Sequence, residues 1–509
     1  MVIRLLSGGL EGVDAFPVEV EVDYARQGLP GFTLVGLAEA AVREAKERVF
    51  AALRACNFRL PPARITVNLA PAALRKSGAG YDLPLAIGLL AASGIINADR
   101  LDNLFFIGEL SLTGEIKPVH GVLPLAILAK KQGADGLVAP PGNAAEAAVT
   151  RGLNVYVPRD LAQCAAFLAG EESLEPHPPF LPDTLSPPLY GLDFSEVKGQ
   201  LSAKRALEVA AAGGHNVLMI GPPGSGKTML AQRLPTILPP LDFEEALEVT
   251  KIYSVAGKLL PGVGLMTTRP FRSPHHTISD VALVGGGGNP RPGEVSLAHR
   301  GVLFLDEMPE YHKSALEVLR QPLEDGYVNI ARVAQSVAYP ANCMLVAAMN
   351  PCPCGYYGDT AHTCLCRPEQ LARYRGRISG PLLDRIDVHV EVPAVPYDDL
   401  RGDVSGEATS AQMRSRVLAA RAVQQRRYAD QAVHCNAELS GGLLEKHCAL
   451  DASGHALLKA AVHNLKLSAR AYTRVLRLAR TIADLAGAEA LRVEHIAEAV
   501  SLRVLDREQ

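Results

Sequence analysis

Hydrophobic residues recur at two different spacings near the start of the chain. Residues 17–22 and 63–69 alternate apolar with polar positions, which predicts half-buried strands. Residues 38–57 repeat apolar side chains at helical spacing, namely Val42, Ala45, Val49 and Leu53. Later strands are predicted at 133–141 and 152–157. Strands that alternate with helices predict an α/β domain in this region.

A second region opens with a mostly apolar predicted strand, residues 216–220. A glycine-rich loop follows, and then helical spacing through Leu230 and Leu234. A loop of this pattern between a strand and a helix predicts a phosphate-binding loop, because its glycines let backbone N–H groups wrap a polyphosphate. A Gly-rich structural turn is the alternative. We expect ATP to contact Gly221, Pro222, Pro223, Gly224, Ser225, Gly226, Lys227 and Thr228.

Within this loop, two side chains have predicted roles. The Lys227 ammonium is expected to reach the β- and γ-phosphates, and the Thr228 hydroxyl is expected to bind Mg²⁺. The N-terminus of the following helix adds a dipole that favours the negative charge of phosphate.

Two further apolar strands end in polar side chains. Residues 301–305 lead into Asp306 and Glu307, and residues 344–349 lead into Asn350. An acidic pair downstream of a phosphate-binding loop is typical of metal-assisted nucleotide hydrolysis. We expect Asp306 to hold Mg²⁺ through water and Glu307 to orient and polarise the attacking water. Asn350 is expected to hydrogen-bond the γ-phosphate or that water.

Two arginines follow in an order that is similar to that of ring ATPases whose catalytic arginine acts on a neighbouring subunit. Arg385 ends the segment 379–385 and is expected to reach the γ-phosphate held by the neighbour. A surface ion pair with Asp384 or Asp387 is the alternative. Arg470 begins a helical segment at the place of the last sensor arginine in such ATPases.

Other residues of this region have weaker assignments. Val197 and Gly199 precede the glycine-rich loop, at a position that packs on the adenine in ring ATPases; an ordinary capped helix is the alternative. Three arginines continue along the helix that Arg470 begins, and we interpret them as a solvated face: Arg474, Arg477 and Arg480.

The composition favours a globular chain of several domains. The chain has 509 residues, of which 48% are hydrophobic and 21% are charged. This length predicts about three domains. Six prolines within residues 171–190 predict a semi-rigid, exposed linker. The predicted domains are 1–170, an ATPase core at 191–395 and a helical lid at 396–509.

The net charge of −3 excludes a strongly basic protein, but the charge is unevenly distributed. Residues 400–509 hold 16 basic against 12 acidic side chains, which fits either a nucleic-acid surface or solvated helix faces. The longest apolar run, 83–98, is short for a membrane span, so we expect a core helix and no membrane association. The N-terminal sequence lacks the pattern of a signal peptide, and we expect a cytoplasmic protein.

Four of the nine cysteines lie within the loop 352–366. They form two Cys-x-Cys pairs: Cys352 with Cys354, and Cys364 with Cys366. Four closely spaced thiolates suit tetrahedral Zn²⁺ and leave no open coordination position, so we expect a structural zinc with His362 as a reserve ligand. Disulfides or free thiols are the alternative. The other cysteines are expected to be buried thiols: Cys56, Cys164, Cys343, Cys435 and Cys448.

Residues 106–119 resemble the C-terminal fold of Lon-type proteases. Those proteases use a Ser–Lys pair, with the serine in a Gly-Pro-Ser-Ala-Gly context. Here Gly80 or a neighbour takes the place of the serine, and the apolar segment 122–127 takes that of the lysine. Ser77 is nearby without an evident basic partner. We therefore expect a Lon-like domain with a structural or assembly role rather than a proteolytic one.

Five longer motifs carry a second resemblance: residues 269–279, 285–288, 292–299, 350–355 and 379–385. They resemble the ComM/YifB family of magnesium-chelatase-like AAA+ ATPases, over essentially the whole chain. The resemblance implies an α/β fold with an N-terminal Lon-protease-like domain, an AAA+ P-loop NTPase core and a C-terminal α-helical lid. The best-known members resemble hexameric motors that drive DNA branch migration during natural transformation.

In this clade, an insertion and a hairpin usually point into the pore of the ring. Here these would be residues 261–297 and 327–339. The hairpin is similar to that of the replicative MCM helicase, whose tip holds a basic residue that touches DNA phosphates. Arg332 takes that place, with a surface hairpin as the alternative. His275 and His276 either contact DNA or cap a turn.

These observations predict a homo-oligomeric, hexameric ring ATPase that uses ATP, Mg²⁺ and Zn²⁺ and moves branched or single-stranded DNA. A branch-migration helicase in recombination or natural transformation is the specific form of this prediction. A chelatase-type ATPase that remodels a protein partner is the alternative, although chelatase ATPase subunits generally lack a Lon-like domain. An ATP-dependent protease would need a nucleophile that we do not find.

Overall fold

The chain forms two compact units, each made of several segments. The computed structural model describes residues 2–180, 191–287, 290–332, 335–358, 362–395, 408–465, 467–503 and 505, except the side chains of residues 40, 332 and 335. Unit 1 contains Met1–Ser186, Asp242–Thr267 and Ala331–Tyr339. Unit 2 contains Pro187–Leu241, Thr268–Ile330 and Pro340–Gln509. Half of the predicted linker, residues 181–190, lies outside the described residues.

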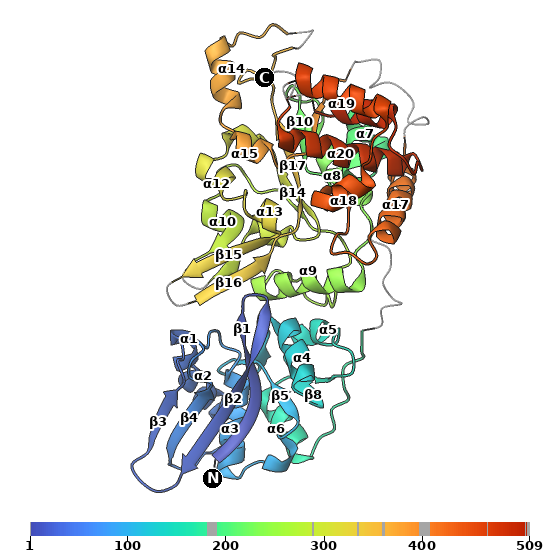
Figure 1. Cartoon of the computed structure of the whole chain (residues 1–509). Coiled ribbons are helices and arrows are strands. Elements are labelled where there is room, and N and C mark those ends of the chain that lie inside the picture. The colour runs from blue at the N-terminus through green and yellow to red at the C-terminus, as the bar shows by residue number, and fades with distance from the viewer. Residues whose placement is uncertain are drawn as a thin grey trace. The chain divides into compact units, whose positions relative to one another are not determined.

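Unit 1 is built on a seven-stranded sheet of order β3-β4-β2-β1-β5-β8-β9 (Figure 1). The strands are β1 (Val2–Glu11), β2 (Asp14–Ala25), β3 (Gly31–Val35), β4 (Arg64–Ala70), β5 (Leu104–Phe106), β8 (Gly136–Val138) and β9 (Asn154–Tyr156). The β2–β1 and β2–β4 pairs are antiparallel, and the other neighbours are parallel. A small pair, β6 (Glu109–Leu110) and β7 (Ile116–Lys117), lies outside this sheet. The strands predicted at 17–22 and 63–69 are confirmed as β2 and β4.

Helices cover the sheet of unit 1. They are α1 (Ala40–Arg43), α2 (Ala45–Ala55), α3 (Asp82–Ser93), α4 (Val122–Lys131), α5 (Ala144–Ala147) and α6 (Leu161–Ala169). The helix predicted at 38–57 is present as α1 and α2, with its apolar face buried as expected. The apolar run at 83–98 forms α3, which packs against β1 and β2 and is buried along nearly its whole length. This confirms the predicted core helix.

A further helix of unit 1, α9 (Phe243–Ala256), comes from the segment that follows the glycine-rich loop in the sequence. The carbonyl oxygen of Ser254 on α9 accepts a hydrogen bond from Gly121 N at 3.1 Å, and its hydroxyl bonds the buried Glu146 carboxylate. These contacts attach α9 to the start of α4 and to α5. A segment next to the predicted nucleotide loop is therefore built into unit 1.

Unit 2 contains a five-stranded parallel sheet of order β11-β14-β17-β10-β18. Its strands are β10 (Val217–Ile220), β11 (Phe271–Arg272), β14 (Val302–Leu305), β17 (Met344–Met349) and β18 (Val388–Glu391). β10, β14 and β17 are buried throughout, which explains their continuous apolar sequences. Two small strand pairs are β12 (Gly285–Gly286) with β13 (Arg291–Pro292), and β15 (Tyr327–Arg332) with β16 (Gln335–Pro340).

Helices of unit 2 accompany this sheet and share its core. They are α7 (Leu201–Gly213), α8 (Lys227–Arg233), α10 (Asp280–Val284), α11 (Glu294–Leu297), α12 (Lys313–Glu317), α13 (Pro322–Asp325), α14 (Pro368–Arg375) and α15 (Gly380–Leu383), followed by α17 (Ser410–Arg427), α18 (Gly441–His447), α19 (Ala452–Asn464), α20 (Ala469–Leu485) and α21 (Val493–Ser501). α17 and α20 pack on α7, and their apolar side chains join those of β10 and β18 in one core (Figure 1). The α/β fold class with a C-terminal helical region is confirmed.

Candidate nucleotide and metal sites

The glycine-rich loop of unit 2 lies at the carboxyl end of β10 and leads into α8. Gly224 and Gly226 have φ angles of +77° and +91°, which side chains with a Cβ rarely adopt. The Lys227 ammonium lies within the loop, where it donates to the carbonyl oxygens of Gly221 at 2.7 Å and Pro222 at 2.8 Å. The backbone geometry thus requires glycine where the sequence pattern has it.

The predicted polar residues converge on this loop from neighbouring strands. Asp306 follows β14 and Asn350 follows β17, and both strands run parallel to β10, so their carboxyl ends share one edge of the sheet. Thr228 Oγ1 donates to Asp306 Oδ2 at 2.7 Å, and Lys227 Nζ donates to Asn350 Oδ1 at 3.3 Å. Four residues from three sequence motifs therefore form one hydrogen-bonded cluster.

Glu307 borders the cluster in a strained conformation. Its φ of +50° is unusual for a residue with a Cβ, and such strain concentrates at functional sites. Its backbone N–H donates to Asp306 Oδ1 at 3.0 Å, and its half-exposed carboxylate lies 3.7 Å from Nδ1 of His276. Burial lowers the pKa of Lys227, while the negative charges of Asp306 and Glu307 oppose that shift.

The predicted adenine segment is attached to the loop through a residue that sequence analysis missed. Val197 is buried, and Gly199 has a φ of +62°. The next residue, Gln200, donates from Nε2 to the carbonyl oxygens of Ser225 at 3.2 Å and Pro393 at 2.6 Å. Nothing in the sequence marked Gln200, because its partners lie far away along the chain.

Arg385 is held by residues outside this cluster. Its guanidinium donates to the carbonyl oxygens of Arg320 at 2.9 Å and Pro381 at 2.6 Å, and it forms an ion pair with Glu324. These groups border a cavity of 480 Å³. The expected alternative partners are engaged elsewhere: Asp384 pairs with Arg470 at 3.2 Å. Among the described residues, Arg385 makes no contact with the loop of its own chain.

The arginines beyond Arg470 correct one prediction. Arg470 itself is exposed, but Arg474 pairs with buried Asp387, and Arg480 is buried where it pairs with Asp484. The interpretation of these arginines as a solvated face is wrong, because acidic side chains distant in the sequence are placed against them. They hold α20 to the rest of unit 2.

Asp387 is the centre of this buried network. Its Oδ2 lies 3.0 Å from Nδ1 of His215, whose Nε2 lies 2.8 Å from the Thr481 hydroxyl. Burial alone would raise the pKa of Asp387, but the hydrogen bond with His215 and the charge of Arg474 outweigh it and lower the pKa below its usual range. The ionised Asp387 therefore links β10, β18 and α20.

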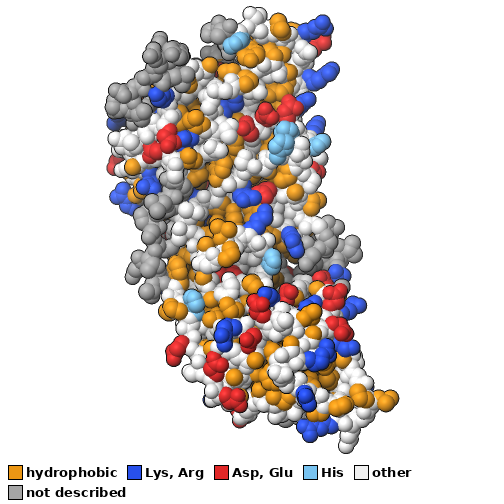
Figure 2. All heavy atoms as spheres, turned by 180° about the vertical axis from the view of Figure 1, so that it is seen from behind, with side chains coloured by type: hydrophobic (Ala, Val, Ile, Leu, Met, Phe, Trp, Pro, Cys, Tyr) orange, Lys and Arg blue, Asp and Glu red, His pale blue; other side chains and the backbone are white. Residues whose placement is uncertain are grey.

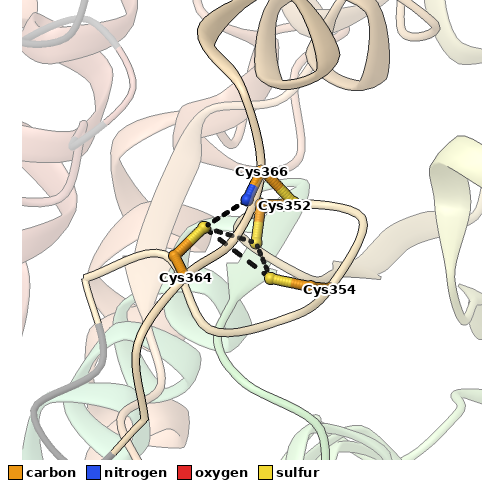
Figure 3. A group of neighbouring side chains, drawn as sticks. All are labelled: Cys352, Cys354, Cys364 and Cys366. Carbon is orange, nitrogen blue, oxygen red and sulfur yellow. Dashed lines mark hydrogen bonds between the residues drawn. The ribbon is translucent and has the colours of Figure 1, made fainter.

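The four clustered cysteines meet in space, as Figure 3 shows. All their Sγ atoms lie within 4.8 Å of one another, with separations of 3.3 Å for Cys352–Cys354 and 3.7 Å from Cys364 to each of these. Tetrahedral zinc at the usual Zn–S length would place sulfurs about 3.8 Å apart. All nine cysteines are described, and none forms a disulfide. The donor set thus fits a zinc ion.

Two other predicted sites have a different outcome. Arg332 is the last residue of β15, and its side chain lies outside the described residues. The rings of His275 and His276 stack at 4.1 Å, and Nδ1 of His275 lies 2.9 Å from the Thr277 hydroxyl. The structure therefore describes a local turn contact for His275 and gives no side-chain placement for Arg332.

In unit 1, the places of the Lon Ser–Lys pair are filled by apolar packing. Gly80 packs tightly against an isoleucine side chain, and Val122 is fully buried at the start of α4. Lys76, beside Ser77, is buried and donates to the carbonyl oxygen of Pro71. Within the described residues, no basic side chain hydrogen-bonds the Ser77 hydroxyl.

Comparison with known proteins places the chain in a family. The family described as magnesium chelatase, subunit ChlI, matches residues 193–400, the one described as subunit ChlI of Mg-chelatase matches 18–143, and the corresponding C-terminal family matches 407–503. The chain is 44% identical to competence protein ComM of Haemophilus influenzae over 502 residues, which cover 97% of this chain and 96% of that protein. It is equally similar to YifB of Escherichia coli, 44% over 497 residues, with the same coverage of each protein.

A more distant relative covers only the central part. The magnesium-chelatase 38 kDa subunit of Rhodobacter capsulatus is 27% identical over 225 residues, covering 40% of this chain and 60% of that protein. The nucleotide cluster and the parallel sheet lie within the matched chelatase region. The chain thus belongs to the ComM/YifB family of magnesium-chelatase-like AAA+ ATPases.

Proposed function

We propose that this protein is a homo-oligomeric ring motor, a hexamer, that hydrolyses ATP to move branched or single-stranded DNA. The observation that carries the proposal is the division of the catalytic groups: Lys227 and Thr228 form one cluster with Asp306 and Asn350, while Arg385 is held outside it. A site of this kind is completed by a guanidinium from a neighbouring copy. The relative from Haemophilus influenzae carries the name competence protein.

Each residue of the cluster has a distinct role in the proposed hydrolysis. Loop N–H groups and Lys227 bind the triphosphate, and Glu307 orients and polarises the attacking water. Asn350 hydrogen-bonds the γ-phosphate or that water. Thr228 and Asp306 offer the oxygen ligands that Mg²⁺ prefers. Mg²⁺, when bound, supplies charge neutralisation on the phosphate oxygens.

We assign DNA contact to a limited set of side chains rather than to a broad basic surface. On the face in Figure 2, basic and acidic side chains are interspersed. The β15–β16 hairpin, with Arg332 near its tip, is the proposed contact. Arg332→Ala should weaken binding to all DNA sequences alike, because phosphate contacts carry no base information. The slope of log affinity against log salt should fall by about 0.7–0.9. Unchanged affinity and slope would remove Arg332 from the DNA path.

Zinc and a reducing compartment complete the proposal. Four thiols in tetrahedral spacing would hold Zn²⁺ as a structural ion. A cytoplasmic location suits nine cysteines without disulfides.

The test is an ATPase assay with and without forked or single-stranded DNA, at several salt concentrations. We expect DNA to stimulate turnover at each concentration at which it binds. The similarity to a chelatase subunit favours one second function, the remodelling of a protein partner. Acceleration by a protein partner, together with no response to any DNA, would establish that function and overturn the DNA motor.

A further inference from the structure

The cysteine loop 352–366 lies against the ATP-binding loop within unit 2. A Cβ atom built on Gly355 would lie only 2.5 Å from Cδ and 2.8 Å from Cγ of Pro223. Real Cβ atoms do not approach other atoms so closely, so the backbone of Gly355 packs directly on the Pro223 ring. One turn of the cysteine loop therefore forms part of the wall behind the nucleotide loop.

Both ends of the cysteine loop lead to Asn350. Cys352 is two residues beyond Asn350, whose side chain accepts a hydrogen bond from Lys227 at 3.3 Å. At the other end, Cys366 is followed by Arg367, the N-cap of α14. The buried hydroxyl of Tyr374 on α14 makes a hydrogen bond with the backbone of Asn350. The loop is thus closed on the residue that contacts Lys227.

Few other contacts hold this loop in shape. Its described residues contain no helix or strand, and its backbone N–H groups turn toward sulfur. Tyr357 N donates to Cys352 Sγ at 3.3 Å, and Cys366 N donates to Cys364 Sγ at 3.4 Å. Such N–H···S bonds orient thiolates toward a metal and stabilise their charge. A metal ion that joins the four sulfurs would therefore supply most of the loop's rigidity.

We propose that Zn²⁺ bound by the four cysteines keeps Gly355 on Pro223 and Asn350 at Lys227, so that metal loading sets the affinity for ATP. The inference rests on the proposed nucleotide site and is independent of DNA. Without the metal, the two ends of the loop separate, and both supports of the nucleotide site are lost. Conditions that remove zinc or oxidise these thiols would then lower nucleotide binding.

The first experiment compares metal content with nucleotide affinity in the full-length protein. We expect one zinc per chain by elemental analysis, and a thiolate-to-metal charge-transfer band when cobalt replaces zinc. Cys364→Ser should lose the metal and weaken binding of a fluorescent ATP analogue by about tenfold or more. Cys343→Ser, at the opposite end of β17, is the matched control and should change neither quantity. Metal-free wild-type protein, or Cys364→Ser protein, that binds ATP normally would overturn the proposal, as would a wild-type protein that binds no metal.

The second experiment separates the metal from the contact it supports. Gly355 and Gly358 have similar φ angles, +87° and +79°, but Gly358 has no atom within 4 Å of the added Cβ. Both alanine variants thus carry the same backbone strain, and only Gly355→Ala meets Pro223. We expect Gly355→Ala to keep its zinc and to bind ATP about tenfold more weakly than Gly358→Ala. Equal affinities of these two variants would overturn the role of this contact.

One further variant distinguishes failure of this inference from failure of the nucleotide assignment. Lys227→Ala should abolish binding of the analogue and leave zinc content unchanged. If Lys227→Ala protein still binds the analogue, the nucleotide site itself is misassigned. If it does not, while zinc loss has no effect on wild-type affinity, only the link between metal and nucleotide is wrong.

Discussion

Unit 1 and unit 2 both place charged side chains beside a mixed or parallel sheet, but they use them in opposite ways. In unit 2, Lys227 and Asp306 lie at the carboxyl edge of the sheet with neighbours that can exchange partners. In unit 1, Arg48 grips the fully buried Asp82 through two hydrogen bonds of 2.6 and 2.9 Å. A third bond, from Leu110 N at 3.2 Å, also reaches the Asp82 carboxylate. The charged pair in unit 1 is satisfied internally.

The difference shows why residue type alone does not identify a site. Both units hold an ionised acid close to a basic side chain, and the Lon-like position even retains a lysine next to a serine. In unit 1 these groups have protein partners that a ligand cannot replace, and apolar side chains such as Val122 fill the place of a catalytic base. Removing a charged group should therefore cost activity in unit 2 and stability in unit 1.

The largest expected effect is on the nucleotide loop. Lys227→Ala should abolish nucleotide binding, because the phosphates lose their only ammonium partner in the loop. Glu307→Gln should retain binding and lower turnover by about 10²–10⁴-fold, since it removes the carboxylate that polarises water. Nucleotide titration and steady-state hydrolysis measure the two effects. Equal loss of binding in both variants would show that the carboxylates are misassigned, and the thermal unfolding of both should match wild type.

The next effect sharpens the contrast from the other side. Arg48→Ala leaves Asp82 charged and buried without its partner, which costs about 3–5 kcal/mol of folding free energy in unit 1. Arg54→Ala, an exposed arginine on the same helix α2, is the control and should stay within about 0.5 kcal/mol. Denaturant unfolding measures both. Nucleotide affinity of Arg48→Ala protein should be normal well below its melting temperature. A selective loss of affinity without loss of stability would break the comparison.

The smallest of these effects concerns a buried group of unit 2 that has no ligand to bind. Burial, together with the charge of Arg503, lowers the pKa of His389 to about 3, and neither ring nitrogen hydrogen-bonds a described residue. The folded state therefore keeps His389 neutral, whereas the unfolded chain takes up a proton below about pH 6.5. This contribution to stability is complete above that pH and is lost as the pH falls toward 3.

At pH 5.5, the loss amounts to about 1.4 kcal/mol relative to pH 7.5. His389→Leu should reduce the acid dependence of unfolding by this amount, and His434→Leu, at an exposed histidine, should not. Urea unfolding at both pH values measures the difference. An unchanged pH dependence in His389→Leu protein would show that His389 is protonated in the folded state.

Local patterns predicted the strands and the nucleotide cluster well. Buried parallel strands are continuous apolar runs, so β10, β14 and β17 could be located from sequence. Because parallel strands end at one edge, the approach of Asn350 to Lys227 also follows from their order. The pairing of two Cys-x-Cys motifs follows equally from their spacing.

Partners that lie far apart in the sequence were not predictable. Burial of Arg480 depends on Asp484 and on the packing of α20, and a run of arginines on a helix gives no sign of it. The partner of Arg385, Glu324, is 61 residues away. The attachment of α9 to unit 1 depends on Ser254 meeting Glu146, 108 residues away. Sequence periodicity reports which face of an element is apolar, and it does not report which element covers that face.

The central claim is that two copies of the chain share each ATP, one binding the triphosphate and the next supplying Arg385. The most direct test co-expresses a Lys227→Ala chain with an Arg385→Ala chain and purifies mixed assemblies through two different tags. Each variant alone should be inactive. A shared site predicts that an equal mixture recovers about a quarter of wild-type turnover, because one in four interfaces of a random ring joins an intact loop to an intact arginine. An Arg385→Ala chain mixed with a Lys227→Ala, Arg385→Ala double variant should recover none. Mixed assemblies that stay inactive at every ratio would contradict a shared site.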